Sequence, residues 1–163
     1  MKQLMKKMVL FAALCIMIMA SGYAQEPSDV ETKFNELIQK YDKVKGVECM
    51  TVVKGNGLGM LKMVLNKRFG KEFLKGVTRI AFINYSKSSQ ETCHALRNEL
   101  DVFKSLMEEF DAGDKKEHAG NDYFRGFALV SDDDKTISDF IIAVEEKETK
   151  IIMYMAGKIK VEQ

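Results

Sequence analysis

The C-terminal part of the chain constrains the fold more than any other stretch. Three segments rich in β-branched and aromatic residues follow one another there, at 123–130, 137–145 and 150–158. The turns between them are short and polar, with charged runs at 132–134 and 146–148. Strands joined by such turns pair in the antiparallel sense, because a parallel crossover needs about a dozen residues. The sequence therefore predicts an antiparallel meander.

The upstream part alternates between helical and strand patterns. Apolar residues recur at steps of three or four in 28–41, 58–69 and 89–110, which predicts three helices. Segments 47–54 and 77–85 are typical of strands. The residues expected to define the apolar sides of the helices are Phe34, Leu37, Ile38 and Tyr41 in the first, Leu61, Val64, Leu65 and Phe69 in the second, and Cys93, Leu96, Leu100, Phe103, Met107 and Phe110 in the third.

This order of elements predicts an α+β fold. We expect a two-layer sandwich in which about five mainly antiparallel strands form one sheet and about three helices pack on one of its faces. The alternation of apolar and polar residues in the last strands predicts that the other face meets solvent. A parallel pairing of the first two strands, joined by a right-handed crossover, stays open.

The first 24 residues have the order of a secretory leader. Lys2, Lys6 and Lys7 form a basic start, an apolar run of 12 residues covers 8–19, and small residues follow up to Ala24. The run is shorter than the ~20 residues that a membrane-spanning helix needs. We therefore expect a signal peptide at 1–24, cleaved before Gln25, and a single domain at 25–163.

Export would place the protein in the periplasm or outside the cell, with membrane contact only through the leader. The leader holds three of the chain's 25 basic residues and none of its 24 acidic ones, so residues 25–163 carry 22 against 24, a net charge of −2. This balance gives no electrostatic argument for binding nucleic acid or an anionic membrane. The expected partner is an envelope protein, a peptide or a glycan.

Residues suited to catalysis or metal binding do not form a recognisable motif. The glycines of 55–59 depart from the dinucleotide-binding spacing, and no Walker lysine and hydroxyl pair follows them. Cys93 and His94 are adjacent on an expected helix, so their side chains do not face each other. No zinc or calcium ligand pattern occurs. We expect no catalytic residues, no cofactor and no metal.

A basic stretch at 62–79 is the candidate binding surface, with Glu72 as its single acid. An acidic partner or an anionic glycan could bind there, and a solvated helix end is the alternative. The candidate residues are Lys67, Arg68, Lys71 and Lys75, with Lys62 and Arg79 at the ends of the stretch. The methionines at 60, 63, 107, 153 and 155 are expected mainly in the core, with an adaptable apolar groove as the alternative.

Cys49 and Cys93 are the cysteines outside the leader. Cys49 shares an expected strand face with Val47 and Val53, and Cys93 lies on the apolar side of the longest expected helix. Both are therefore expected in the same helix–sheet interface. We expect two free buried thiols, with a disulfide as the alternative because export brings the chain into an oxidising compartment.

Several segments together resemble a known type of protein. They are a leader ending in Ala-Gln, a Phe-containing helix and strand (FNELIQKYDKVKGVECMTV), a Gly-rich step before a Met- and Leu-rich helix (GLGMLKMVLNKRFG), and a strand pair closing in IIMYMAGKIKV. In these the chain resembles small exported proteins of Bacteroidetes-type bacteria that are classed as a domain of unknown function. The resemblance implies an envelope location and an α+β fold, and it carries over no active-site residues.

The lack of an acid–base, nucleophile or metal constellation favours a non-enzymatic exported domain that binds a protein, a peptide or another envelope component. The alternative is a small hydrolase or ligand-binding protein with a site assembled from separate residues such as Asp132, His118 and Tyr123. A deep pocket in which these side chains converge would favour the alternative. An exposed surface of Met and Phe would favour binding.

The leader makes a direct prediction about the mature chain. Because signal peptidase cuts after small residues, we expect the exported protein to begin at Gln25. Intact-mass measurement of the exported protein checks this start. A mass that still includes residues 1–24 would contradict the prediction.

Overall fold

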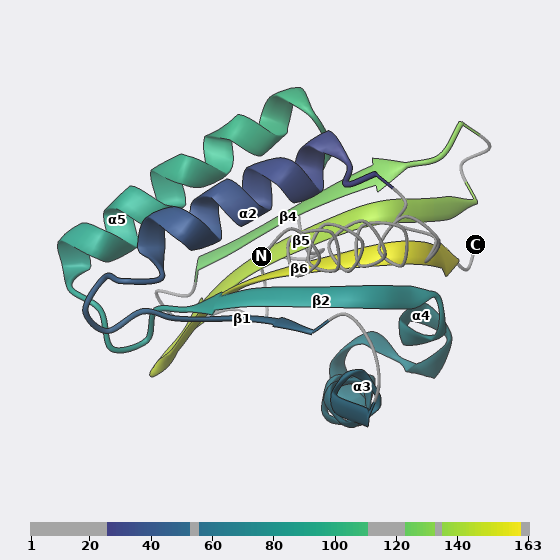
Figure 1. Cartoon of the computed structure of the whole chain (residues 1–163), viewed down its shortest axis with the longest axis horizontal. Coiled ribbons are helices and arrows are strands. Elements are labelled where there is room, and N and C mark those ends of the chain that lie inside the picture. Colours follow the sequence, from purple (N-terminus) through teal and green to yellow (C-terminus); the bar gives the residue numbers. More distant parts are fainter. Residues whose placement is uncertain (1–25, 53–55, 111–122, 133–134, 161–163) are drawn as a thin grey trace, which may run out of the picture.

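The computed structural model describes residues 26–52, 56–110, 123–132 and 135–160 (Figure 1). The helices in these residues are α2 (Asp29–Tyr41), α3 (Asn56–Phe69), α4 (Lys71–Lys75), α5 (Gln90–Glu99) and the 3₁₀ helix η1 (Leu100–Ser105). The strands are β1 (Glu48–Val52), β2 (Val77–Asn84), β3 (Glu108–Phe110), β4 (Tyr123–Val130), β5 (Thr136–Glu146) and β6 (Thr149–Lys160). None of these helices combines the length and the apolar character that crossing a bilayer requires.

The described strands form one six-stranded sheet in the order β1-β2-β6-β5-β4-β3, and every neighbouring pair is antiparallel. The predicted α+β class and the meander of the last three strands are confirmed. The count of about five strands was one too low, because β3 lies in a segment expected to be helical. β1 pairs directly with β2, with Glu48 opposite Asn84, so the first two strands are not parallel.

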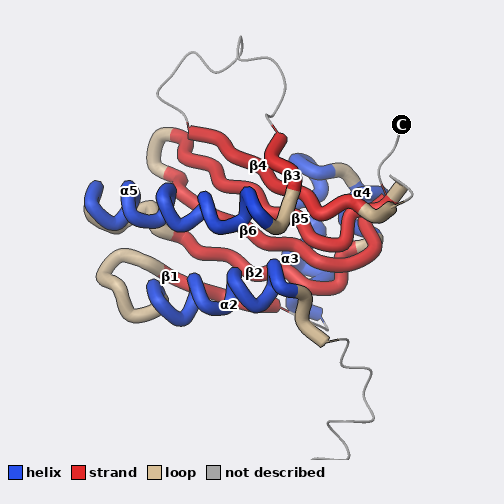
Figure 2. Tube along the Cα trace, turned by 90° about the horizontal axis from the view of Figure 1, so that it is seen from above, coloured by secondary structure: helices blue, strands red, loops and turns tan. Residues whose placement is uncertain are grey.

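Helices lie on both faces of the sheet, so the expectation of helices on one face only was wrong. Figure 1 shows α2 and α5 over one face and α3 and α4 beyond the other, and Figure 2 shows α2 and α5 side by side. Neighbouring strand residues point to opposite faces. Ile141 therefore belongs to the first core, with α2 and α5, whereas Phe140 and Ile142 belong to the second, with α3 and α4. Consecutive apolar residues in β5 thus require cover on both sides.

The first core forms where α2 and the α5–η1 segment pack on the sheet. Ser28 caps α2, since its hydroxyl accepts a hydrogen bond from the Glu31 N–H over 3.1 Å, as the capping-box spacing predicts. Phe34 of α2 is fully buried and stacks on Tyr154 of β6, with the ring centroids 5.2 Å apart. This stacking joins the helix layer to the centre of the sheet.

The second core is built around Phe140 of β5. Its ring meets Phe73 of α4 at a centroid distance of 5.3 Å, Phe110 of β3 at 5.5 Å and Phe69 of α3 at 6.2 Å. Aromatic pairs at such distances contribute beyond their burial. One strand residue therefore joins α3, α4 and the edge strand β3.

The apolar period of segment 89–110 predicts one helix, but the structure divides this segment. α5 ends at Glu99, η1 follows, and β3 begins at Glu108. Phe110 pairs opposite Gly126 of β4, where a β-carbon would lie 2.4 Å from the Phe110 ring. The missing side chain at Gly126 lets the ring lie across β4 toward Phe140. Strand pairing and aromatic packing thus override the helical pattern.

Two glycines give a matched test of this packing. Gly126→Ala is expected to lower the free energy of unfolding by about 1–3 kcal/mol, because the new β-carbon displaces the Phe110 ring. Gly59→Ala in α3 meets nothing within 4 Å. It is expected to raise stability by about 0.5–1 kcal/mol through helix propensity. Urea unfolding followed by circular dichroism measures both, and equal effects would contradict the proposed role of Gly126.

Candidate functional site

Glu145 of β5 is one of two buried carboxylates among the described residues. Tyr85 Oη and Arg97 Nε donate hydrogen bonds to its Oε1 over 2.9 and 2.8 Å, and Arg97 Nη2 donates to its Oε2. Burial alone would raise the pKa of Glu145, but the hydrogen bonds from Arg97 and Tyr85 outweigh it and lower that pKa. Burial, reinforced by the Glu145 charge, raises the pKa of Tyr85. The group is a charged structural acceptor, not a proton donor.

Asp139, the second buried carboxylate, joins the start of α2 to the sheet. Its Oδ1 accepts hydrogen bonds from Ser28 Oγ and Tyr154 Oη, both at 2.7 Å, and its Oδ2 accepts one from Ser138 Oγ at 2.8 Å. Burial and then the Asp139 charge raise the pKa of Tyr154. With both oxygens engaged, Asp139 anchors the capped end of α2.

Cys49 and Cys93 are both free thiols. Cys93 is buried in the first core as expected, whereas Cys49 is only half-buried and packs against that core. Burial, with a smaller contribution from the Asp42 charge, raises the pKa of the Cys49 thiol to about 11. Lys150 Nζ lies 3.2 Å from the Cys93 sulfur. Cys93 is buried and His94 is exposed, so these neighbours do not form a nucleophile–base pair.

The two described residues of the alternative hydrolytic site, Tyr123 and Asp132, do not converge. Tyr123 begins β4 and Asp132 follows its end, so an eight-residue strand, roughly 25 Å long, separates them. His118, Asp133 and Asp134 lie outside the described residues. Within the described part of the chain, no group of three or more His, Cys, Asp or Glu residues could hold a metal ion.

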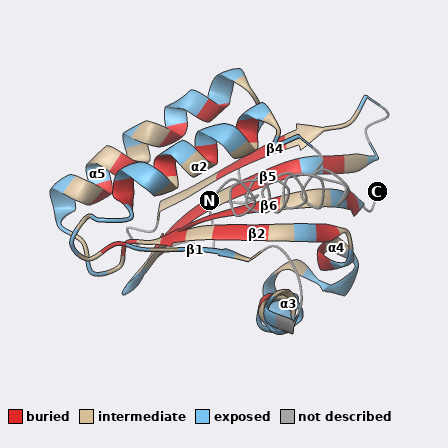
Figure 3. Ribbon diagram, viewed as in Figure 1, coloured by how far each residue is buried: buried red, intermediate tan, exposed pale blue. Residues whose placement is uncertain are grey.

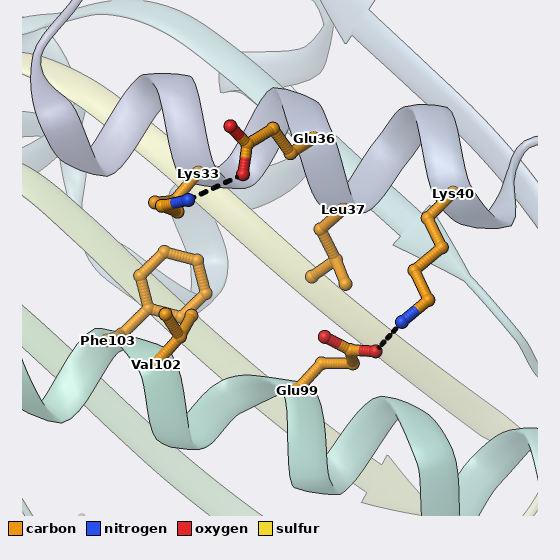
Figure 4. A pocket seen from close by; sticks show the side chains of 7 residues that line it. All are labelled: Lys33, Glu36, Leu37, Lys40, Glu99, Val102 and Phe103. Carbon is orange, nitrogen blue, oxygen red and sulfur yellow. Dashed lines mark hydrogen bonds and ion pairs between the residues drawn. The ribbon is translucent and has the colours of Figure 1, made fainter.

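A groove of about 280 Å³ lies between α2 and the α5–η1 segment (Figure 4). The residues lining it are Lys33, Glu36, Leu37, Lys40, Glu99, Val102 and Phe103. Its charged residues are paired, since Lys33 Nζ lies 2.7 Å from Glu36 Oε2 and Lys40 reaches across to Glu99. A small-ligand site usually offers polar groups that converge on its occupant. In this groove the charged side chains pair with one another, so they do not converge on a ligand.

The candidate basic residues gather on α3 and α4. All four of them, Lys67, Arg68, Lys71 and Lys75, are exposed, and together they are called the basic surface below. Arg68 Nη2 lies 3.3 Å from Glu146 Oε2, and Lys75 Nζ lies 4.0 Å from Glu72 Oε2. These two pairs offset the charges of Arg68 and Lys75, whereas neither Lys67 nor Lys71 forms an ion pair with a described acid, so the surface keeps a positive charge. Arg79, at the end of the basic stretch, instead pairs with Glu31 of α2 and does not contribute to it.

Beside the basic surface, α3 exposes three large apolar side chains. Met60, Met63 and Val64, called the α3 stripe below, have exposed fractions of 65%, 73% and 73%. Their spacing of i, i+3 and i+4 places them along one side of the helix. Figure 3 shows that much of α3 is exposed, whereas the central strands are largely buried.

The α3 stripe corrects the expectation for Val64 and divides the methionines into core and exposed residues. Val64 was expected on the buried side, but the side that meets the second core carries Leu61 and Leu65, and Leu65 is only 8% exposed. Adjacent helix residues point about 100° apart, so Val64 turns outward. Met107, Met153 and Met155 are core residues as expected, whereas Met60 and Met63 are not. Segment 58–65 holds more apolar residues than one helix side can bury, and this excess already indicates that some of them are exposed.

Comparisons with known proteins do not assign the chain to a family. No protein-family model, no curated protein and no solved structure matches it. The resemblance to exported Bacteroidetes-type proteins therefore stays a prediction. The candidate site rests on its own residues.

Glu145 predicts how stability changes in acid. Its folded-state pKa is lowered, so its contribution is present above the ordinary pKa of 4.5 and is lost as the pH falls through the lower folded-state value. Glu145→Gln should therefore be less stable at neutral pH, yet lose less stability between about pH 5 and pH 2 than the native chain. Urea unfolding across this range measures the difference.

The exposed Glu148 supplies the matched control for this measurement. Glu148→Gln is expected to follow the native pH profile. Parallel profiles for the native chain and Glu145→Gln would show that Glu145 does not set the acid sensitivity.

Proposed function

We propose that this protein is an exported, non-enzymatic binding domain that binds an anionic component of the cell envelope through the outer surface of α3 and α4. The observation that supports this most is the α3 stripe beside the basic surface. Single exposed apolar residues are ordinary on folded proteins. A contiguous apolar set bordered by charge is typical of an interaction site.

Covering the α3 stripe would supply a useful part of the affinity. Its side chains are 65–73% exposed in the structure. Full burial of a Met or Val side chain is worth about 1.5–3 kcal/mol, so covering all three yields roughly 3–6 kcal/mol before the cost of association. The cations of the basic surface add attraction and orientation.

The state of the buried polar groups favours binding over hydrolysis. Asp139 and Glu145 are occupied by structural hydrogen bonds, and burial keeps the Cys49 thiol protonated near neutral pH. Catalytic acids, bases and nucleophiles need pKa values matched to their task and an open approach to substrate. None of these three described groups meets both conditions.

The predicted leader supports a partner in the cell envelope, since a cleaved chain would meet other components only after export. The resemblance to exported proteins implies the same location. An anionic partner follows from the sign of the basic surface, and an apolar element in that partner follows from the α3 stripe.

Site-specific photo-crosslinking in intact cells tests this proposal. A photoreactive residue in place of Met63 is expected to form discrete adducts with envelope components. Val102 is 42% exposed and lies on the opposite side of the molecule. The same photoreactive residue in its place is expected to form no such adducts. Lys67→Glu with Lys71→Glu is expected to reduce the adducts from position 63 at least about tenfold, because it reverses two cations of the basic surface.

A stability measurement separates loss of binding from loss of folding. Met60→Ser and Met63→Ser are each expected to change the free energy of unfolding by less than about 0.5 kcal/mol, because both side chains are exposed. Equal adducts from positions 63 and 102, or adducts insensitive to the charge reversal, would contradict the proposed binding surface.

A further inference from the structure

We infer that the anionic component is the surface of a lipid bilayer, on which α3 lies with the α3 stripe among the acyl chains and the basic surface among the headgroups. This inference rests on the proposed function and names the partner of the same surface.

The position of α3 suits contact with a flat surface. It lies at the periphery, beyond β2 and on the opposite side from α2 and α5 (Figure 1). Leu61 and Leu65 face the second core, which leaves Met60 and Met63 pointing away from the protein. Lys67, seven residues after Met60, continues the same line along the helix. Helices in a membrane interface place apolar side chains at the acyl boundary and cations at the headgroups, and this line offers side chains of both kinds.

The lysines beside the stripe can reach headgroups while the methionines insert. Lysine has a long aliphatic stem that lies along apolar surface and holds its ammonium in water. Lys67 and Lys71 are exposed beyond the stripe. Both kinds of contact can therefore form at once.

The distribution of charge selects one orientation. Residues 56–75 contain five basic residues and one acidic residue, a net charge of +4. Residues 25–163 carry −2 in total, so everything outside 56–75 carries −6. An anionic surface attracts the first part and repels the second, which turns α3 and α4 toward the membrane.

Other partners match fewer of these features. A second copy of this chain would bring two surfaces of charge +4 together, which is unfavourable. A glycan polyanion would pair with the basic surface but leave the α3 stripe exposed to water. An acidic protein would need a groove shaped to a protruding helix. A bilayer supplies anionic headgroups above an apolar interior and requires no complementary shape.

This inference departs from the expectation that membrane contact is limited to the leader. That expectation follows from the net charge of −2 for residues 25–163 as a whole. The fold overrides this average, because α3 and α4 together expose the cations and α3 turns Met60 and Met63 outward beside them.

The chain contains no Trp, so one introduced indole reports on its own position. Met63→Trp, purified in its exported form, is titrated with vesicles of phosphatidylcholine mixed with phosphatidylglycerol. Its emission is expected to shift to shorter wavelength and to be quenched by brominated acyl chains. Val102→Trp, the matched control on the opposite side, is expected to show neither change. Both variants are prepared in the same form, so they differ only in the position of the indole.

Co-sedimentation with the same vesicles gives affinities for the variants. Met60→Ser with Met63→Ser is expected to weaken binding at least about tenfold, because the inserted groups are lost. Lys67→Glu with Lys71→Glu, or vesicles of phosphatidylcholine alone, should weaken it by a similar factor, and added salt should weaken native binding. Val102→Ser is expected to bind like the native chain.

The outcomes separate this inference from the proposed function. An unshifted Met63→Trp spectrum on anionic vesicles, or an equal shift from Val102→Trp, overturns the bilayer inference. If position 63 still forms charge-dependent crosslinks in cells, the binding surface stands with a protein or glycan as its partner. If those crosslinks are also absent, both proposals fall.

Discussion

Apolar side chains on both faces of the central strands are the constraint on which the rest of the structure depends. Phe140, Ile141 and Ile142 follow one another in β5, and their alternating directions create two cores. Because burial of apolar surface dominates folding, each face needs a cover. α2 and the α5–η1 segment provide one cover, and α3 and α4 provide the other. The position of every helix follows from this requirement.

The two faces are secured by different interactions, and this difference separates stability from binding. On the first face, Asp139 holds the capped end of α2 and Glu145 binds Arg97 of α5. Buried carboxylates of this kind are costly unless fully paired, and here they are. On the second face, Phe140 gathers its aromatic neighbours, and the polar link from α3 to β5 is the exposed Arg68–Glu146 pair. The outer side of α3 is then free to carry residues that the core does not need.

Much of the fold could be predicted from the sequence because it is written in local patterns. Short polar turns specify the meander, and the serine at position 28 specifies where α2 begins. The failures occur where distant residues decide the outcome. Phe110 continues a helical period, yet its ring lies over Gly126 and against Phe140, so the chain is extended there. The candidate basic residues could be named in advance because lysine and arginine are exposed almost everywhere.

The sequence by itself determined the α+β class, the antiparallel meander, the leader-like start and the basic stretch, since each depends on composition or on spacing between near neighbours. Only the tertiary structure decided that both faces of the sheet are covered and that Val64 and the methionines at 60 and 63 point outward. An apolar residue carries no mark of which side of its helix will meet a core. That choice is made by the packing of α3 on β2 and α4, where burial of Leu65 turns its neighbours toward solvent.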